Sequence, residues 1–157
     1  MKFEEFVSFE ATVSELTTPD RDGVIAELVS SLVQAGRLPA ASATEITKAV
    51  IKRENEASTG MGKGVAIPHV KHGAVKDVLA VFGQSSSGID FAALDEQPVY
   101  AVILLISPLD NPDRHLQAME NVFRHLQNEK FRKFLRQCRT PGRLEDLLKE
   151  ADENPSW

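Results

Sequence analysis

Cysteine is nearly absent from this chain, which has one, Cys138, among 157 residues. A single cysteine cannot form an internal disulfide, and it excludes a zinc site built on several thiolates. We therefore expect a cytoplasmic protein. Long apolar runs are missing too: the longest, Val99 to Ile106, has eight residues, whereas a membrane-spanning helix needs about 20. The first thirty residues hold no apolar segment behind a basic start, so we expect neither a secretory signal nor direct membrane insertion.

The chain also lacks an excess of basic residues. It has 18 Lys and Arg against 23 Asp and Glu, a net charge of −5 with histidine neutral, so nucleic acid is not expected as a partner. The charge is uneven, because residues 111–143 hold eight basic and three acidic residues while the rest of the chain carries −10. We interpret the basic stretch as the solvated face of late helices.

The composition is that of one folded domain. Apolar residues make up 42% and charged residues 26%, the usual mixture of a globular protein, and the length suits a single core. We expect the domain to span residues 1–151 and a polar C-terminal tail to follow at 152–157.

Two helices are predicted in the first third of the chain. Apolar residues recur at helical spacing between Thr18 and Gly36, with Thr18 placed as the N-cap, Pro19 at the first helical position and Gly36 at the end. A second helix is predicted to begin at Ser42 and Glu45, which have the spacing of a capping box.

Three apolar segments predict buried strands at residues 65–67, 78–82 and 99–106. The last is apolar throughout, as expected when helices cover both faces of a sheet. Residues 85–88 are expected to form a polar turn, and three amphipathic helices are predicted after Pro108. Helices before, between and after strands predict an α/β layered domain with a mixed sheet.

Four histidines are the first candidates for chemistry. His69 follows a buried strand and Pro68, so its ring should emerge at the carboxyl end of that strand, where ligands collect in α/β sheets. His115 lies near a helix start, beside the apolar face. His125 lies more than about 120° from the centre of that face and is expected to point to water. His72 has an i, i+3 spacing from His69 that can bind metal, but no cysteine or close carboxylate pair supports a full site.

A glycine-rich loop precedes His69. In STGMGKG, residues 58–64, three glycines permit unusual backbone angles, so that amides and the hydroxyls of Ser58 and Thr59 can surround an anion. It is not a nucleotide-binding loop, because the order here is helix, loop, strand rather than strand, loop, helix. No GxSxG motif is present, and Cys138 falls on an apolar helical stripe. A histidine that accepts a phosphoryl group is the chemistry that remains.

Several motifs in one order resemble a known family. They are Arg53-Glu54, Ser58-Thr59-Gly60, GVAIPH, GIDFAALD, PVYAVILLISP and His115-Leu116. Together they are similar to the fructose/mannitol-type enzyme IIA domain of the bacterial phosphoenolpyruvate-dependent phosphotransferase system, a family that includes the nitrogen-regulatory enzyme IIA. The resemblance covers nearly the whole chain. It implies a mixed parallel and antiparallel sheet with helices on both faces.

The resemblance also implies roles for particular residues. His69 is expected to take a phosphoryl group from the phosphocarrier HPr, with His115 stabilising that group and Arg53 balancing its charge. The predicted phosphate loop consists of Ser58, Thr59 and Gly60. No cofactor and no metal are implied. The phosphoryl group is expected to pass to an enzyme IIB, or to act as a regulatory signal read by a target protein.

Other interpretations of the same residues stay open. Arg53 can instead pair with Glu54 or Glu56 as a helix-end cation. Val70 and Glu96 stand where many family members have glycine, which bears on the choice of partner.

The function has alternatives of other classes. A metal-binding domain would use His69, His72 and His115, and a purely regulatory protein would act through interactions alone. The acidic remainder of the chain suits docking of a basic phosphocarrier.

Overall fold

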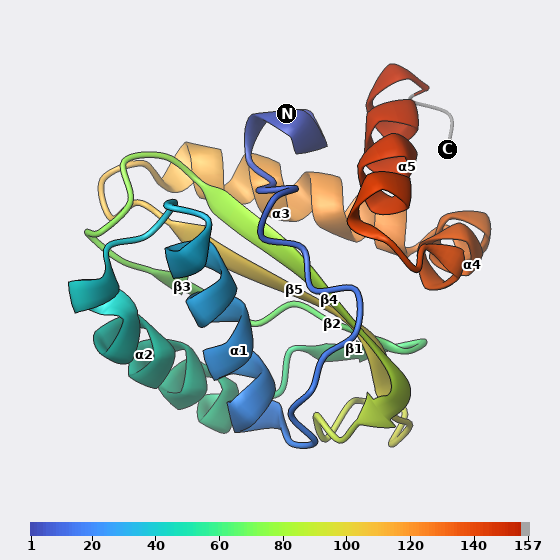
Figure 1. Cartoon of the computed structure of the whole chain (residues 1–157), viewed down its shortest axis with the longest axis horizontal. Coiled ribbons are helices and arrows are strands. Elements are labelled where there is room, and N and C mark those ends of the chain that lie inside the picture. Colours follow the sequence, from blue (N-terminus) through green and yellow to red (C-terminus); the bar gives the residue numbers. More distant parts are fainter. Residues whose placement is uncertain (155–157) are drawn as a thin grey trace.

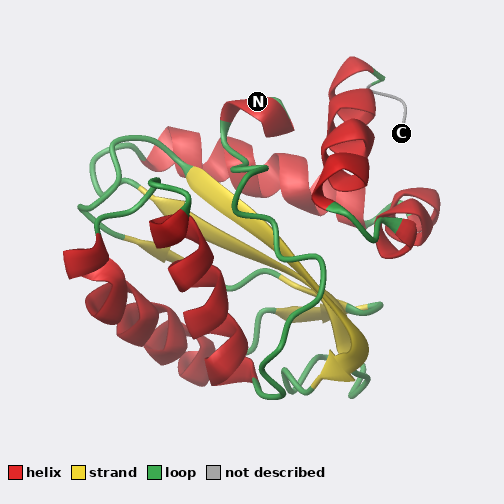
Figure 2. Cartoon of the chain, in the orientation of Figure 1, coloured by secondary structure: helices red, strands yellow, loops and turns green. Residues whose placement is uncertain are grey.

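The computed structural model describes residues 1–154, which form a five-stranded mixed sheet between two layers of helices (Figures 1 and 2). The central strand is β5 (Val99–Ser107), and β4 (Leu79–Ile89) pairs antiparallel with one of its edges. Two short strands, β2 (Val65–Ala66) and β3 (His69–Lys71), pair parallel with β5. β1 (Gly60–Gly62) pairs antiparallel with β2. The predicted α/β class with a mixed sheet is confirmed.

Pro68 separates β2 from β3. β2 pairs with residues 101–102, and pairing resumes at His69, opposite Leu105. Proline has no N–H to donate, so it interrupts the strand, although its carbonyl accepts the N–H of Leu105 at 3.0 Å. The interruption makes His69 the first residue of a new strand, beside the carboxyl-terminal part of β5.

Helices cover both faces of the sheet (Figure 1). One face is covered by α1 (Arg21–Gln34) and α2 (Ala43–Glu56). The other is covered by the 3₁₀ turn η1 (Phe3–Glu5), α3 (Pro112–Leu126), α4 (Glu129–Gln137) and α5 (Pro141–Glu153). Alternate residues of β5 enter the two cores, which explains why this strand is apolar throughout. Within residues 1–154, no helix is both long and apolar enough to span a bilayer.

The predicted start of α1 was wrong, and at α2 the predicted capping box does not form although Ser42 is the N-cap, as expected. α1 begins at Arg21 with Asp20 as its N-cap, whose side chain accepts the N–H of Gly23. The hydroxyl of Thr18, the expected cap, instead donates to Glu27 at 2.9 Å. At α2 a 3₁₀ turn (Ala40–Ser42) precedes the helix, and the Ser42 side chain makes no capping hydrogen bond. Thr18 and Asp20 lie two residues apart, and either side chain can cap a helix. The Thr18 hydroxyl is bonded to Glu27, and Asp20 caps α1.

The prediction of a polar turn at residues 85–88 was also wrong, because β4 continues through these residues to Ile89. Its polar groups find partners in distant segments. The Gln84 side chain donates to the Leu135 carbonyl at 2.8 Å, and the backbone N–H of Ser86 donates to the Glu15 carboxylate at 3.0 Å. The sequence did not reveal this part of β4, because its polar groups are satisfied by other elements and its residues do not alternate between apolar and polar.

His125 was expected to point to water, and this was wrong: it is 3% exposed. The N-terminal segment and α4 cover the side of α3 that an isolated helix would leave to solvent. The ring centre of His125 lies 4.7 Å from that of Phe3 and 5.3 Å from that of Phe131, and its Nδ1 donates to the Asn121 carbonyl. By contrast, the apolar side chain of Leu116 in the same helix is 63% exposed.

The C-terminal helix runs two residues past the domain end expected at residue 151. α5 ends at Glu153, and the Asp152 carboxylate accepts the backbone N–H groups of Phe3 and Glu4 at 2.7 and 3.1 Å. Of the expected tail at 152–157, residues 155–157 lie outside the described part of the chain.

Candidate functional site

The two histidines with roles predicted from the sequence, His69 and His115, lie together near the carboxyl end of β5. His69 opens β3, and His115 stands in the first turn of α3, which follows β5. Their ring centres are 5.8 Å apart and the rings are inclined by 44°. The parallel pairing of β3 with β5 places both strand ends at the same edge of the sheet, so the fold brings together residues 46 positions apart in the sequence.

The protonation of His69 is determined by its backbone neighbour. Nδ1 lies 2.8 Å from the carbonyl oxygen of Ile67, two residues earlier. A carbonyl oxygen can only accept, so Nδ1 carries the proton and the lone pair of the neutral ring is on Nε2. Pro68 holds the carbonyl of Ile67 in place by restricting the backbone between them. The geometry therefore leaves Nε2 as the nucleophilic atom.

The pKa of His69 is lowered from its ordinary 6.5, chiefly because the ring is largely buried. The positive charges of Arg53 and Lys71 act in the same direction, while the hydrogen bond to Ile67 and the charge of Glu54 act against it. The ring is therefore neutral at physiological pH and retains a lone pair that can attack an electrophile.

His115 is oriented by Ser107, the last residue of β5. The Ser107 Oγ lies 2.6 Å from His115 Nδ1 and is fully buried. Among residues 1–154 this is the one partner of the hydroxyl, so its proton must be donated to Nδ1 to avoid a buried, unsatisfied donor. His115 then carries its proton on Nε2. Burial lowers its pKa, as do the charge of Lys71 and the charge that His69 carries when protonated, so that the ring acts as a neutral hydrogen-bond donor.

Arg53 lies in the last turn of α2, and its charge acts on His69. One guanidinium nitrogen donates to the Ala57 carbonyl at 2.9 Å. In the described part of the chain no carboxylate lies within 4.0 Å of Arg53, so the pairing with Glu54 or Glu56 considered above does not form. The remaining N–H groups of the guanidinium are thus available for an anion.

Glu54 was not predicted to matter beyond that pairing, yet it anchors the glycine-rich loop. It is 2% exposed, and its carboxylate accepts both the backbone N–H of Thr59, at 2.8 Å, and the Thr59 hydroxyl. The signal was present in the sequence: Glu54 continues the buried row of α2 formed by Ile46 and Val50, four residues apart. A carboxylate at a buried helix position needs a hydrogen-bonding partner, because burial removes it from water.

Replacing Glu54 with alanine is expected to lower the free energy of unfolding by about 2 to 3 kcal/mol, because two donors of Thr59 lose their buried acceptor. The matched change Glu56→Ala, at an exposed position of the same helix, should stay within about 0.5 kcal/mol of the wild type. Urea unfolding followed by circular dichroism measures both. Equal losses in the two variants would show that Glu54 does not anchor the loop.

The three predicted loop residues are held by protein groups. The Ser58 hydroxyl donates to the Phe91 carbonyl and accepts the N–H of Gly60, and the Thr59 hydroxyl is bonded to Glu54. A Cβ at Gly60 would lie 2.8 Å from that of Ala93, so only glycine fits there. These contacts give the loop a fixed shape. Their role in phosphate binding stays a prediction.

His72, the third histidine of the metal alternative, is engaged elsewhere. Its Nε2 lies 2.9 Å from the Glu45 carboxylate of α2, and its Nδ1 accepts the N–H of Ala74. Over residues 1–154 there is no group of three or more His, Cys, Asp or Glu side chains arranged to hold a metal ion.

Comparison with known proteins gives one family. The family model described as "Phosphoenolpyruvate-dependent sugar phosphotransferase system, EIIA 2" matches residues 5–151. The fructose-specific EIIA component of Haloferax volcanii is 34% identical over 133 residues, 85% of each chain. The nitrogen regulatory protein of Bradyrhizobium diazoefficiens is 30% identical over 148 residues, 94% of this chain and 95% of that one. This chain spans 24% of the fructose-specific EIIABC component of Bacillus subtilis, to which it is 30% identical.

Solved structures have the same fold. The nitrogen regulatory protein IIA-Ntr from Neisseria meningitidis superposes with a TM-score of 0.82 at 24% identity, covering 92% of this chain and 97% of that one. Enzyme IIA for mannitol from Escherichia coli, in its complex with phosphorylated enzyme IIB, superposes with a TM-score of 0.72 at 20% identity, covering 90% and 95%.

Proposed function

Because this chain belongs to the EIIA 2 family of the phosphoenolpyruvate-dependent sugar phosphotransferase system, we propose that it is a phosphocarrier that accepts a phosphoryl group on His69. One observation carries the assignment to this residue. His69 is a partly buried, neutral histidine whose Nδ1–H is held by the Ile67 carbonyl, which leaves Nε2 beside His115 as a nucleophile.

The proposed transfer uses groups that are already in position. The lone pair on Nε2 of His69 forms a bond to phosphorus while the bond between phosphorus and the donor atom breaks, and the donor leaves with that electron pair. Positive charge develops on the His69 ring, and the Ile67 carbonyl stabilises it through the Nδ1–H. Little further machinery is required, because phosphoryl transfer depends mainly on positioning and charge.

The other side chains of the site would stabilise the phosphoryl oxygens. His115 would donate from Nε2, in the tautomer set by Ser107. Arg53 would contribute its charge and its unengaged N–H groups, and a planar guanidinium suits a phosphoryl dianion. We expect Ser58, Thr59 and Gly60 to shape the loop beside this site, because the hydroxyl protons of Ser58 and Thr59 are already donated to the protein.

We propose an HPr-like phosphocarrier as the donor and an enzyme IIB as the acceptor. A related mannitol enzyme IIA forms a complex with phosphorylated enzyme IIB, which supports that acceptor. A regulatory use of the phosphoryl group is the second candidate, favoured by the similarity to nitrogen regulatory proteins over nearly their full length. The family supports phosphotransfer over a metal-binding domain. The cytoplasmic location expected from the single cysteine stays a prediction.

The reaction can be tested with purified components. Incubation with phosphoenolpyruvate, enzyme I and HPr should add one acid-labile phosphoryl group to the chain, visible as an increase in intact mass. Omission of HPr is the control, because direct transfer from enzyme I would mean a different donor. An unchanged mass in the complete mixture would contradict the proposed function.

The pH dependence of the transfer follows from the lowered pKa of His69. The neutral ring is the reactive form, so the rate should be constant around neutral pH and fall on acidification, with its midpoint below 6.5. Lys71→Gln should move the midpoint upward, because it removes a charge that lowers this pKa. NMR titration of the His69 ring and initial rates of labelling measure the two effects. A midpoint above 6.5 in the wild type would contradict the burial argument.

A further inference from the structure

A concentration of positive charge lies at the end of the sheet opposite the histidines. It lines a groove of about 940 Å³ between α4 and the turn that joins β1 to β2. We call this the basic groove; six of its lining residues are the cations Lys63, Lys130, Arg132, Lys133, Arg136 and Arg139. Glu129 is its one acidic lining residue. The basic groove therefore has an excess of positive charge, whereas the whole chain has a net charge of −5.

The protein orders several of these cations without neutralising them. Arg136 stacks on Tyr100, with 4.2 Å between the guanidinium carbon and the ring centre, and Arg132 donates to the Leu126 carbonyl at 2.7 Å. Within the described residues, no carboxylate lies within 4.0 Å of the charged nitrogens of Lys63, Lys133 or Arg139. Like charges held in one groove repel one another, and a bound anion would relieve that repulsion.

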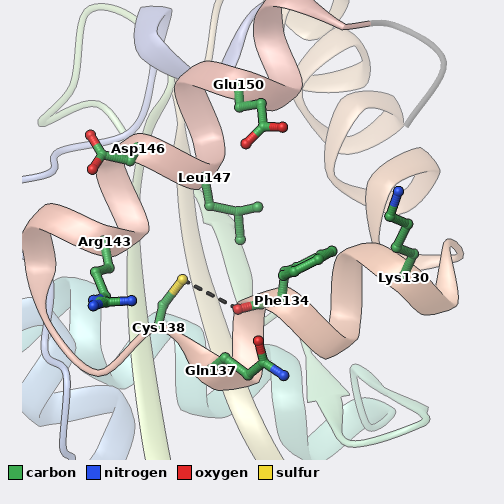
Figure 3. Close-up of a pocket in the computed structure, with 8 residues that line it drawn as sticks. All are labelled: Lys130, Phe134, Gln137, Cys138, Arg143, Asp146, Leu147 and Glu150. Carbon is green, nitrogen blue, oxygen red and sulfur yellow. Dashed lines mark hydrogen bonds between the residues drawn. The ribbon is translucent and has the colours of Figure 1, made fainter.

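A second pocket, of mixed apolar and charged lining, flanks the other side of α4. It lies between α4 and α5, and Figure 3 shows Phe134, Cys138 and Leu147 inside it. Phe134 is 39% exposed, so this large apolar side chain is accessible from solution. Charged residues of both signs line the same pocket: Arg143, Asp146 and Glu150 from α5, and Lys130 from α4. A ligand that crosses α4 would therefore meet cations on one side and, on the other, apolar side chains among charged groups of both signs.

From these two neighbouring surfaces we infer that α4 is a docking site for an acidic protein segment that carries an apolar side chain. The carboxylates of such a segment match the basic groove, and its apolar side chain fits beside Phe134 and Leu147. A DNA duplex fits less well, because its uniformly charged backbone has no apolar group to place beside the exposed Phe134.

The position of this site separates it from phosphoryl transfer. Arg136 contacts Tyr100, near the start of β5, whereas Ser107 and the histidines lie at the end of that strand. Tyr100 and Ser107 are seven residues apart in β5, which corresponds to about 23 Å along an extended strand. Figure 1 shows α4 and β3 at opposite ends of the molecule. A partner on α4 would leave His69 accessible, so the inference goes beyond the proposed function and does not depend on it.

The test uses a short fluorescent peptide, rich in glutamate with one central leucine, and the full chain. Binding is measured by anisotropy at low salt, and the contacted residues are mapped by amide chemical shifts. We expect shifts in α4 and around Lys63, with none at His69. The double variant Lys133→Glu/Arg139→Glu should weaken binding by about tenfold or more. A peptide with serine in place of the leucine should bind more weakly than its parent.

Matched variants separate the groove from overall charge. Arg37→Glu/Lys48→Glu makes the same change in net charge at exposed positions on the other side of the sheet, and it should leave peptide affinity within about twofold. All four replaced residues are exposed, and circular dichroism checks that both variants fold. Equal weakening by both variants, or shifts centred on His69, would overturn the inference. So would tighter binding of a DNA duplex than of the peptide, which would identify a nucleic-acid site instead.

Discussion

Replacing His69 with alanine is expected to abolish phosphoryl uptake completely. The variant lacks the nucleophile, and no second histidine is arranged to replace it: His72 is bonded through both nitrogens, and His125 is buried beneath the N-terminal segment. His115 Nδ1 is likewise occupied, by Ser107. The variant should therefore show no labelling at all, rather than slower labelling.

Intact mass after incubation with phosphoenolpyruvate, enzyme I and HPr measures this loss. His72→Gln is the matched control, because it removes a histidine from the same segment of chain and should label as the wild type does. The His69 variant should keep its fold, since the ring makes a single hydrogen bond, to its own backbone. Labelling of His69→Ala to the wild-type extent would place the acceptor elsewhere and would remove the basis of the proposed mechanism.

Replacing His115 with alanine is expected to slow phosphorylation by about a hundredfold, the usual cost of removing one donor that stabilises developing charge. Ser107→Ala should slow it less, by about tenfold, because the ring remains but its tautomer is no longer fixed by the buried hydroxyl. The order of the two effects tests the role of Ser107: a merely structural serine would change the stability of the fold and leave the rate unchanged.

Single-turnover transfer from phosphorylated HPr separates chemistry from binding for these variants. We expect the maximal rate to fall while the concentration of HPr needed for half-maximal rate stays close to that of the wild type, because neither side chain is proposed to contact HPr. His115→Gln, which keeps an N–H donor at the site, should recover part of the lost rate. A wild-type rate for His115→Ala would contradict the stabilising role.

Much of this site was predictable because its residues follow clear sequence signals. His69 directly follows a buried strand and a proline, and a strand end fixes the direction of the side chain that comes next. His115 lies one helical turn after Pro112, which marks a helix start. Ser107 was missed because it closes an apolar run, where it appeared to be the end of a strand rather than the partner of a histidine eight residues later.

The errors have a common physical cause. His125 seemed exposed because a helical projection takes account of one helix, whereas η1 and α4 pack over α3 and bury that side. The polar strand from Gln84 to Ile89 and the N-cap of α1 were misjudged in the same way, since partners distant in sequence or competing nearby satisfied their polar groups. Local patterns carry no information about such partners.

By itself, the sequence determined the layered α/β class and the principal strands and helices, because apolar periodicity and strand ends are local properties of the chain. It also singled out the residues that we propose accept and stabilise a phosphoryl group. Only the tertiary structure decided which of these residues meet and in which protonation state. The parallel pairing of β3 with β5 brings His69 beside His115, and the Ile67 carbonyl and Ser107 hydroxyl then fix where each proton resides. Hydrogen bonds depend on distances of a few tenths of an ångström, which packing sets and composition does not.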